Sequence, residues 1–307
     1  MDSNIQKGAE EGNGWQRQMQ EKLRETENIV TRWLPEETGH QRLIFQAMNY
    51  SVLAGGKRLR PMLMKEVYRL FGGQGEEIEP FMAAIEMIHT SSLVHDDLPA
   101  MDADEYRRGK KTTWVVYGED MAILAGDALM IYAFEVASKA FGLAVHPMRV
   151  GKAVEILAAR TGIYGMIGGQ TVDVELTGHP MTEEQLDFVY RLKTGALLEA
   201  SMLIGAVLAG ACEEEQRRVS QMALAIGMAF QIQDDILDVT GDEKVTGKPV
   251  GSDEKNSKTT YVTLKGLEGA KALVEEYSRQ AIGILDGFPA ENPFLRQLIL
   301  SLINRKS

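Results

Sequence analysis

The sequence contains only one cysteine, Cys212, among its 307 residues. An intrachain disulfide is therefore impossible, and we expect a reducing, cytoplasmic setting. Basic residues are also scarce, because 33 Lys and Arg stand against 44 Asp and Glu, for a formal net charge of -11. This balance argues against a nucleic acid partner and against docking on anionic lipid, since both require a positively charged surface.

Long hydrophobic runs are missing as well. The most apolar stretch, residues 196–212, is interrupted by Glu199, and the uninterrupted remainder is too short to cross a bilayer. We therefore expect a buried helix there and no membrane span. Residues 1–14 are polar, which predicts a disordered tail rather than a signal peptide.

The rest of the chain shows helical spacing of apolar residues. Clear period-two alternation, fixed-length repeats and breaks in composition are all absent from the sequence. We expect one all-α domain over residues 15–307, and Thr182 to Gln185 predict a capping box at the start of one helix. The main predicted helices cover residues 15–34, 37–53, 80–97, 122–141, 148–175, 182–210, 213–239, 266–285 and 293–303, with one more ending near residue 71.

Acidic residues gather where one apolar helix, residues 81–94, ends. Asp96, Asp97 and Asp102 follow it closely, and Arg107-Arg108 comes next. Oxygen ligands suit Mg2+, which prefers a few carboxylates together with phosphate oxygens, and the planar guanidinium groups match phosphate. The segment predicts a Mg2+-diphosphate site, although a solvated acidic helix end is the alternative interpretation.

A second acidic motif ends another apolar helix. Asp234 and Asp238 are four residues apart and so share one helical face at a separation of about 6 Å, with Asp235 turned aside. Such acids beside apolar neighbours are costly unless they bind a metal. Two helices of this kind packed side by side would bring six carboxylates together across a cavity.

A glycine turn feeds directly into basic residues in the segment Gly55-Gly-Lys57-Arg58-Leu-Arg60-Pro61. Lys57 and Arg60 are three residues apart and share a face if a helix begins there. A helix N-terminus with basic side chains is a natural phosphate cradle. A cationic surface loop is the alternative.

With these motifs in this order, the chain resembles the trans-prenyltransferases, the short-chain isoprenyl diphosphate synthases of the farnesyl or geranylgeranyl type (polyprenyl synthetases). The resemblance implies a helical bundle of the isoprenoid synthase type around a deep central cavity, usually as a homodimer. The matching motifs, spread between residues 55 and 258, are Gly55–Pro61, His89–Gly109, Gly168-Gly-Gln170 with Asp173, Lys193-Thr194, Phe230–Asp238 and Gly247-Lys248-Pro249.

The resemblance also assigns site residues. It implies three Mg2+ ions on the allylic diphosphate, with ligands from both acidic motifs: Asp96, Asp97, Asp102, Asp234, Asp235 and Asp238. The same diphosphate would be held by Arg107, Lys193 and Lys248. The diphosphate of isopentenyl diphosphate would be bound by Lys57, Arg60, His89 and Arg108. Beside the reacting carbon would lie Thr194 and Gln231, and the following loop would be closed with help from Lys258.

The implied reaction explains these residue types. Ionisation of an allylic C–O bond needs a neutralised diphosphate leaving group, which metal ions with Lys and Arg provide. The allylic cation must then meet the double bond of isopentenyl diphosphate before water does, so a dry apolar cavity is needed. Loss of a proton completes the head-to-tail condensation.

Small residues precede the first acidic motif, where bacterial farnesyl synthases commonly carry an aromatic floor. Ser91 and Ser92 stand there, about 6–8 Å below Asp96 on an α-helix. Two serines leave the cavity open, which favours geranylgeranyl diphosphate (C20) over farnesyl diphosphate (C15). Alternatively, Ser91 faces a neighbouring helix and the floor lies elsewhere, for example at Ile88, Met87, Phe81 or Met166–Ile167.

Three other functions compete with this hypothesis. His95-Asp96 and His89 are faintly similar to HD-type metal phosphohydrolases, a class that leaves Lys57 and Arg60 without a task. A terpene cyclase needs no second diphosphate site. An inactive regulatory homologue normally has eroded acidic motifs, and both motifs are intact here.

Overall fold

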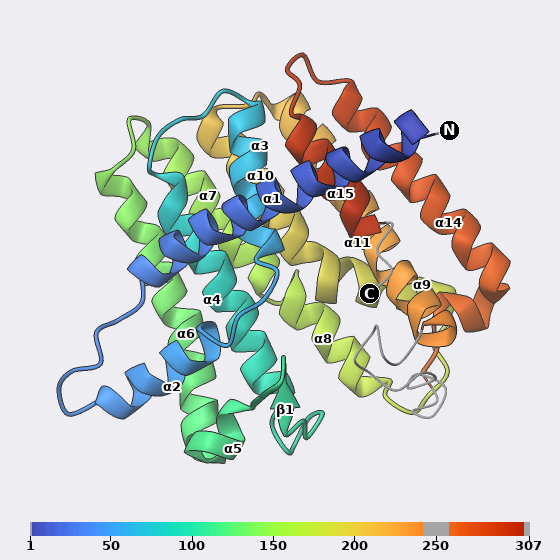
Figure 1. Cartoon of the computed structure of the whole chain (residues 1–307). Coiled ribbons are helices and arrows are strands. Elements are labelled where there is room, and N and C mark those ends of the chain that lie inside the picture. Colours follow the sequence, from blue (N-terminus) through green and yellow to red (C-terminus); the bar gives the residue numbers. More distant parts are fainter. Residues whose placement is uncertain (1, 242–257, 304–307) are drawn as a thin grey trace. The chain divides into compact units, whose positions relative to one another are not determined.

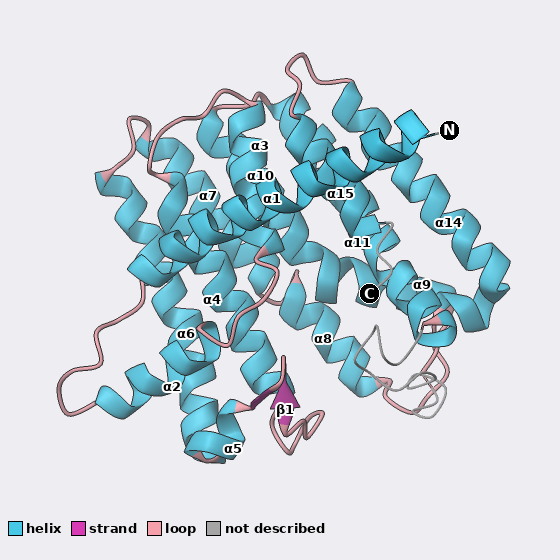
Figure 2. Cartoon of the chain, viewed as in Figure 1, coloured by secondary structure: helices cyan, strands magenta, loops and turns pink. Residues whose placement is uncertain are grey.

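The described chain is almost entirely helical, as the sequence predicts (Figure 2). The computed structural model describes residues 2–241 and 258–303. Its contacts divide the chain into two compact units, each built from two segments. The first unit comprises residues 1–62 and 76–144, and the second unit comprises residues 63–75 and 145–307.

The first unit centres on α4, which is apolar around most of its circumference and is packed along α6 (Figure 1). A helix that is apolar on all sides must be covered on all sides, and α1 and α2 also contact α4. The elements of this unit, with α3 crossing into the second, are α1 (Asp2–Arg32), α2 (Arg42–Val52), α3 (Leu59–Leu70), α4 (Ile78–Asp96), β1 (Tyr106–Arg107), β2 (Lys110–Lys111), α5 (Thr113–Tyr117), α6 (Glu119–Ser138) and η1 (Lys139–Gly142).

The second unit is built around α11, which packs against α10 and α14. The segment η2, a π-helical stretch, contacts α8, α9, α10 and α11. The elements of this unit are α7 (Pro147–Thr161), α8 (Met166–Glu175), α9 (Glu183–Val189), η2 (Tyr190–Gly195), α10 (Ala196–Ala209), α11 (Glu213–Thr240), α14 (Tyr261–Asp286) and α15 (Pro293–Ile303).

Local sequence patterns predicted some of these helices correctly and others incorrectly. The capping box at Thr182 is confirmed, because its hydroxyl accepts from the Gln185 amide at 3.3 Å and the Gln185 side chain accepts from the Thr182 amide at 2.9 Å. The single helix expected over residues 148–175 is wrong. It is two helices, α7 and α8, separated by a turn that contains Gly162 and Gly165, residues of low helix propensity.

Two further features escaped the sequence analysis. The strands β1 and β2 form a two-residue antiparallel pair, too short to produce an alternating pattern. The helix expected over residues 182–210 contains the π-helical segment, whose wider turn leaves no local sequence signature. Residues 2–14 have helical backbone as part of α1, where the composition predicts a disordered tail. The tail and the domain at 15–307 stay predictions.

Two helical stretches are long and apolar enough to cross a membrane, judged by length and composition alone: residues 119–142 and residues 183–209. The second is 72% buried within the structure, as expected for a core helix, whereas the first is only 39% buried. The exposed part of the first stretch therefore needs a separate explanation.

Candidate active site

The first acidic motif lies at the carboxyl end of α4. Asp96 is the last helical residue and half-buried, whereas Asp97 is buried at 4% exposure. The chain then folds back, because the amide of Asp102 donates to the carbonyl of Asp96 at 2.9 Å. Asp102 is exposed. This turn leaves Asp96 and Asp102 accessible and directs Asp97 into the protein.

Asp97 is held by Arg107 from the β1–β2 hairpin. Its Oδ1 accepts from Arg107 Nε at 2.7 Å and lies 2.6 Å from Arg107 Nη2, which is also 3.4 Å from Asp104. Burial raises the pKa of Asp97, and the hydrogen bond and charge of Arg107 offset part of that rise. Burial alone would lower the pKa of Arg107, but the hydrogen bond and charge of Asp97 raise it overall. The Asp97–Arg107 contact fixes the hairpin against the helix.

The basic loop of the first unit is fixed by a residue to which the sequence analysis gave no role. Arg58 is buried and donates to Glu86 on α4 at 2.6 Å and to the carbonyl of Val52 at 2.6 Å. Its backbone has a φ of 47°, in the left-handed region that costs energy for a non-glycine residue. This buried ion pair sets the start of α3, and with it the side chains of Lys57 and Arg60. The only sequence signal is the helical spacing of Glu86 and His89.

Arg108 also holds the basic loop in place, because its Nη1 donates a hydrogen bond to the carbonyl of Gly55. Its guanidinium lies over Gly56, where a Cβ would stand 2.7 Å from Nη1 and where φ is 144°. The positive φ favours glycine at this position, and the absence of a side chain lets the guanidinium approach. The loop and the hairpin therefore meet at Arg108.

His89 sits on α4 within what we call the arginine cluster, formed by Arg58, Arg60, Arg107 and Arg108. Burial lowers the pKa of His89 well below its usual value, and the charges of the four arginines lower it further. His89 is therefore neutral at pH 7. Three of the four residues expected at the isopentenyl diphosphate site, His89, Arg60 and Arg108, are brought together, and Lys57 is exposed on the same loop.

The second acidic motif lies on α11 in the second unit. Asp234 and Asp238 are half-buried, whereas Asp235 is buried at 3% exposure. Asp235 accepts hydrogen bonds from the hydroxyl of Tyr190 at 2.8 and 2.9 Å and from the amide of Tyr261 at 2.9 Å. Asp235 therefore makes hydrogen bonds within the protein, although the family resemblance implies a role as a metal ligand.

The segment η2 carries Lys193 and Thr194. Lys193 Nζ lies 2.5 Å from Asp173 on α8, and the Thr194 hydroxyl donates to Gln231 Oε1 on α11 at 2.9 Å. Gly169 allows this approach, since a Cβ there would collide with the backbone nitrogen of Lys193. Motifs far apart in sequence are therefore joined at one point.

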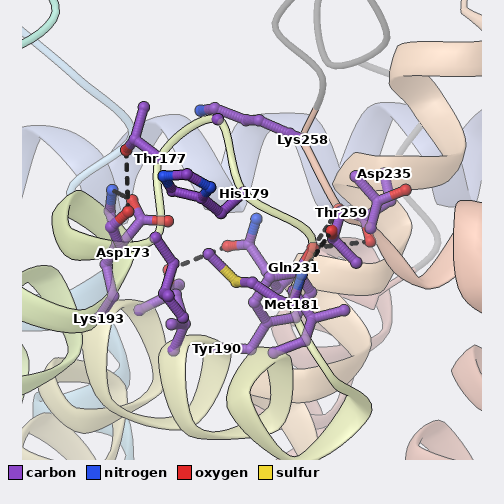
Figure 3. A pocket seen from close by; sticks show the side chains of 16 residues that line it. Asp173, Thr177, His179, Met181, Tyr190, Lys193, Gln231, Asp235, Lys258 and Thr259 are labelled. Atoms are coloured by element: carbon purple, nitrogen blue, oxygen red, sulfur yellow. Dashed lines mark hydrogen bonds and ion pairs between the residues drawn. The ribbon is translucent and has the colours of Figure 1, made fainter.

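A cavity of about 130 Å³ opens beside this point (Figure 3). It is lined by Lys193, Thr194, Gln231 and the exposed Lys258, as well as by residues that the sequence analysis missed. His179 is exposed and also lines it. The other missed lining residues include Tyr190, Met181 and Thr259, which no motif contains. Lys248 lies outside the described residues.

The donor set fits a divalent ion that is completed by substrate oxygens. Within residues 2–241 and 258–303, no group of three His, Cys, Asp or Glu side chains is arranged to hold a metal ion. Each unit instead presents two accessible carboxylates, Asp96 with Asp102 and Asp234 with Asp238. Mg2+ is commonly bound by one or two carboxylates plus phosphates rather than by an all-protein cage. That the two motifs share one cavity stays a prediction.

The serines below the first motif are buried. Ser91 has 0% exposure, and its hydroxyl finds no hydrogen-bond partner among the described residues. Ser92 is half-buried and donates to the carbonyl of His89 at 2.9 Å. Ile88 is also buried at 0% exposure. The position expected to set product length is therefore occupied by a small side chain in a tightly packed helix.

The histidine of the phosphohydrolase alternative has a packing role. His95 Nε2 lies 3.2 Å from the carbonyl of Ile123 on α6 and 3.6 Å from Asp127 Oδ1. It therefore joins α4 to α6 in the first unit. This contact removes the main reason for an HD-type metal site.

An all-α fold with accessible acid pairs, an arginine cluster and a lysine-lined cavity defines a class of protein suited to diphosphates. The model of the polyprenyl synthetase family matches residues 41–284, and the chain belongs to this family. Membership makes it a prenyltransferase of a family that uses divalent metal ions. The recognition and the fold class expected from the sequence are confirmed.

Similar proteins and similar solved structures support the same family. The large subunit 1 of a chloroplastic heterodimeric geranylgeranyl pyrophosphate synthase from Arabidopsis thaliana is 46% identical, over 81% of this chain and 68% of that protein. A farnesyl diphosphate synthase from Geobacillus stearothermophilus is 44% identical, over 82% of this chain and 85% of that protein. The crystal structure of an FPP/GFPP synthase from Zymomonas mobilis, in apo form, has a TM-score of 0.83 and 32% identity, covering 94% of this chain and 99% of that one.

Proposed function

We propose that the chain condenses isopentenyl diphosphate head-to-tail with allylic diphosphates and that its main product is geranylgeranyl diphosphate. The observation that carries the proposal is the arginine cluster around neutral His89. Arg58 and Arg107 are paired with Glu86 and Asp97, so the charges of Arg60 and Arg108 remain to attract an anionic ligand, in a chain whose net charge is -11. The relatives named for geranylgeranyl and farnesyl diphosphate support this reaction class.

In this proposal the first unit binds isopentenyl diphosphate. Arg60 and Arg108 supply charge and planar donors to its phosphates, and exposed Lys57 adds a flexible ammonium group. Burial lowers the pKa of both arginines, and the negative charge of Glu86 opposes that shift. His89 stays neutral until the diphosphate arrives and then donates one ring N–H. The Arg58–Glu86 pair holds these groups in place before binding.

The second unit would hold the allylic diphosphate at the cavity shown in Figure 3. Lys193 and Lys258 line it and would bind phosphate oxygens, with Lys193 exchanging its partner Asp173 for the ligand. Arg107, although paired with Asp97 in this structure, and Lys248 complete the proposed set. These positively charged groups would neutralise the departing diphosphate anion, and this stabilises the transition state in which the C–O bond breaks.

Magnesium is the proposed metal, with three ions held through the accessible acids Asp96, Asp102, Asp234 and Asp238. When bound, it supplies the positive charge that neutralises a leaving diphosphate. Asp97 and Asp235 act through the protein instead, since both are buried and hydrogen-bonded to it.

The reacting carbons need dipoles without nucleophilicity. The Thr194 hydroxyl donates to Gln231, so the oxygen lone pairs of Thr194 and the amide of Gln231 can face a developing cation without attacking it. The cation then adds to the double bond of isopentenyl diphosphate, and the released diphosphate is a reasonable base for the final proton. Cys212 is exposed at the N-terminus of α11 and takes no part in this scheme.

We propose that the small residue at position 91 contributes to product length. A buried hydroxyl without a partner costs about 1–3 kcal/mol, so Ser91 is not there for stability of the packing alone. On the proposal that the growing chain reaches this position, we expect Ser91→Phe to shorten the product, because the larger ring would compete with the chain for room there. Ser92→Phe tests the second of the two serines, on the adjacent helical face. If both variants still make the wild-type product, the floor lies elsewhere, for example at Ile88.

The direct test incubates the protein with isopentenyl and farnesyl diphosphates and Mg2+, and identifies the product by mass. We expect geranylgeranyl diphosphate. Failure to extend farnesyl diphosphate, with extension of shorter primers, would favour a farnesyl diphosphate synthase, the alternative supported by the Geobacillus and Zymomonas proteins. Failure with every primer would reject the proposed function.

A homodimer accounts for the exposed apolar face of α6. Ile123, Leu124 and Ile131 are 41%, 54% and 71% exposed, beside a hollow that also includes Leu43 of α2. Such a face on a charged protein marks an interface with protein or membrane. We expect light scattering to show a dimer and Ile131→Glu to weaken it, whereas vesicle binding without dimerisation would favour a membrane. The cytoplasmic location stays a prediction.

A further inference from the structure

Asp235 is the member of the second acidic motif that faces the protein interior. It is 3% exposed, and both of its carboxylate oxygens accept hydrogen bonds. The donors come from two other elements: the hydroxyl of Tyr190 in η2, and the amide of Tyr261 at the first turn of α14. One carboxylate on α11 therefore connects three elements of the second unit.

The contacts continue around this carboxylate. The rings of Tyr190 and Tyr261 lie 5.7 Å apart, and the hydroxyl of Tyr261 donates to Asp187 on α9. Nearby, the amide of Met181 donates to the Thr259 hydroxyl at 3.0 Å (Figure 3). The amide of Tyr261 is one of the first-turn donors that a helix cannot satisfy internally, and a carboxylate there is favoured by the helix dipole.

Each connected element carries a residue of the cavity. Lys193 and Thr194 follow Tyr190 by three and four residues within η2. Lys258 precedes Tyr261 by three residues. On α11 itself, an inward Asp235 turns Asp234 away by about 100° of helical rotation. The position of Asp235 therefore fixes the setting of all these side chains together.

We propose that Asp235 is a positioning residue rather than a metal ligand, and that through Tyr190 and Tyr261 it holds Lys193, Thr194 and Lys258 around the allylic diphosphate. The proposal rests on the proposed function for the identity of that ligand. It replaces the metal-binding role that the sequence suggested for Asp235. The physical basis is that a buried carboxylate whose two oxygens already accept from the Tyr190 hydroxyl and the Tyr261 amide would need to break these bonds to bind a metal.

The test compares Asp235→Asn with Tyr190→Phe, which removes only the hydroxyl and keeps the ring. Tyr132→Phe on α6, in the other unit, is the control for loss of a tyrosine hydroxyl. Initial rates are measured as a function of substrate and of Mg2+ concentration. We expect both variants to lower kcat by about tenfold or more, as misplaced reactive groups do, with the Mg2+ concentration for half-maximal rate unchanged.

The double variant should be no slower than the slower single variant, because both changes break the same connection. Asp235→Ala should lose more activity than Asp235→Asn, which keeps one acceptor oxygen. The proposal is overturned if Asp235→Asn raises the Mg2+ requirement by about tenfold, the scale on which lost ligand support acts, while Tyr190→Phe behaves as wild type.

Hydrogen exchange provides a readout that does not depend on activity. In both variants, amides of residues 190–195 and 260–263 should exchange faster by about tenfold or more, with α15 unchanged. Unchanged exchange at residues 190–195 and 260–263 would contradict the positioning role. If the wild-type protein makes no prenyl product but these segments loosen as expected, the proposed function fails and the structural connection stands.

Discussion

Asp97 and Asp235 occupy equivalent places in the two acidic motifs, each directly after an aspartate that is half-buried. They are exposed by only 4% and 3%, yet their partners differ. Asp97 faces the guanidinium of Arg107, whereas Asp235 faces a phenol and a backbone amide. A charged partner keeps the first pair ionic and ties it to a surface hairpin. Neutral donors tie the second to the core of its unit.

The difference suggests that the two adjacent aspartates of each motif have different roles. In the proposed scheme, the first aspartate of each motif stays accessible to the ligand, and the second anchors the segment that carries it. An anchor of the ionic type is partly exposed and sensitive to salt, while a hydrogen-bonded anchor in the core is not. The predictions below test this division, beginning with the largest expected effect.

Substitution of an accessible aspartate should give the largest loss of activity. We expect Asp96→Asn and Asp234→Asn each to lower kcat by about 100-fold or more, the scale for loss of one preorganised electrostatic group. Asp97→Asn and Asp235→Asn should lose about tenfold, because they act through other residues. Steady-state kinetics of product formation measures both. Equal losses at the inner and outer aspartates would contradict the division of tasks.

The two inner acids should differ in their response to salt. Asp97→Asn and Asp235→Asn should each lower the free energy of unfolding by about 1.5–3 kcal/mol, since each breaks hydrogen bonds to a charged group. In about 1 M NaCl the loss at Asp97 should shrink, because the Debye length is then only about 3 Å and Arg107 is 30% exposed. The loss at Asp235 should not change. Urea unfolding at two salt concentrations decides this.

The close approach at η2 gives a third prediction. Gly169→Ala should destabilise the protein by about 1–3 kcal/mol and lower activity, because the new methyl group displaces the backbone of Lys193. Gly283 in α14 is the matched control, since a Cβ there meets nothing within 4 Å. Gly283→Ala should stabilise by about 0.4–1 kcal/mol. Thermal melts of both variants would contradict the packing at η2 if their shifts had the same sign.

The smallest expected effect is the pH dependence of His89. The folded protein keeps His89 neutral, since burial and then the arginine cluster lower its pKa, while the unfolded chain takes up a proton below about pH 6.5. Its contribution to stability is therefore present above that pH and is lost as the pH falls. Relative to His89→Gln, the wild type should lose about 1 kcal/mol between pH 7.5 and 5.5. A constant difference across this range would show that His89 is not held neutral.

Local chemistry explains what the sequence could predict. The capping box at Thr182 and the i, i+4 spacing of Asp234 and Asp238 depend only on residues close in the chain, so the sequence pattern predicts both features. The motif resemblance placed Thr194 and Gln231 at one site, and the structure joins them although they are 37 residues apart.

What the sequence could not predict depends on tertiary partners. Asp235 bonds Tyr190, 45 residues away, and Arg58 bonds Glu86, 28 residues away, and no spacing rule links such positions. The inward turn of Asp97 and Asp235 follows from such tertiary partners, which the sequence alone does not reveal. The π-helical segment around Lys193 likewise contacts α8, which is distant in sequence, and no local pattern marks it.

The central claim is that the accessible acids of both motifs act on one diphosphate. A double-mutant cycle on Asp96→Asn and Asp234→Asn tests it, with the dissociation constant of an unreactive allylic diphosphate analogue measured by calorimetry in saturating Mg2+. The account predicts strongly non-additive losses, with a coupling free energy of about 0.5–3 kcal/mol. Losses that add to within about 0.3 kcal/mol would show that the two motifs serve separate sites, and would contradict it.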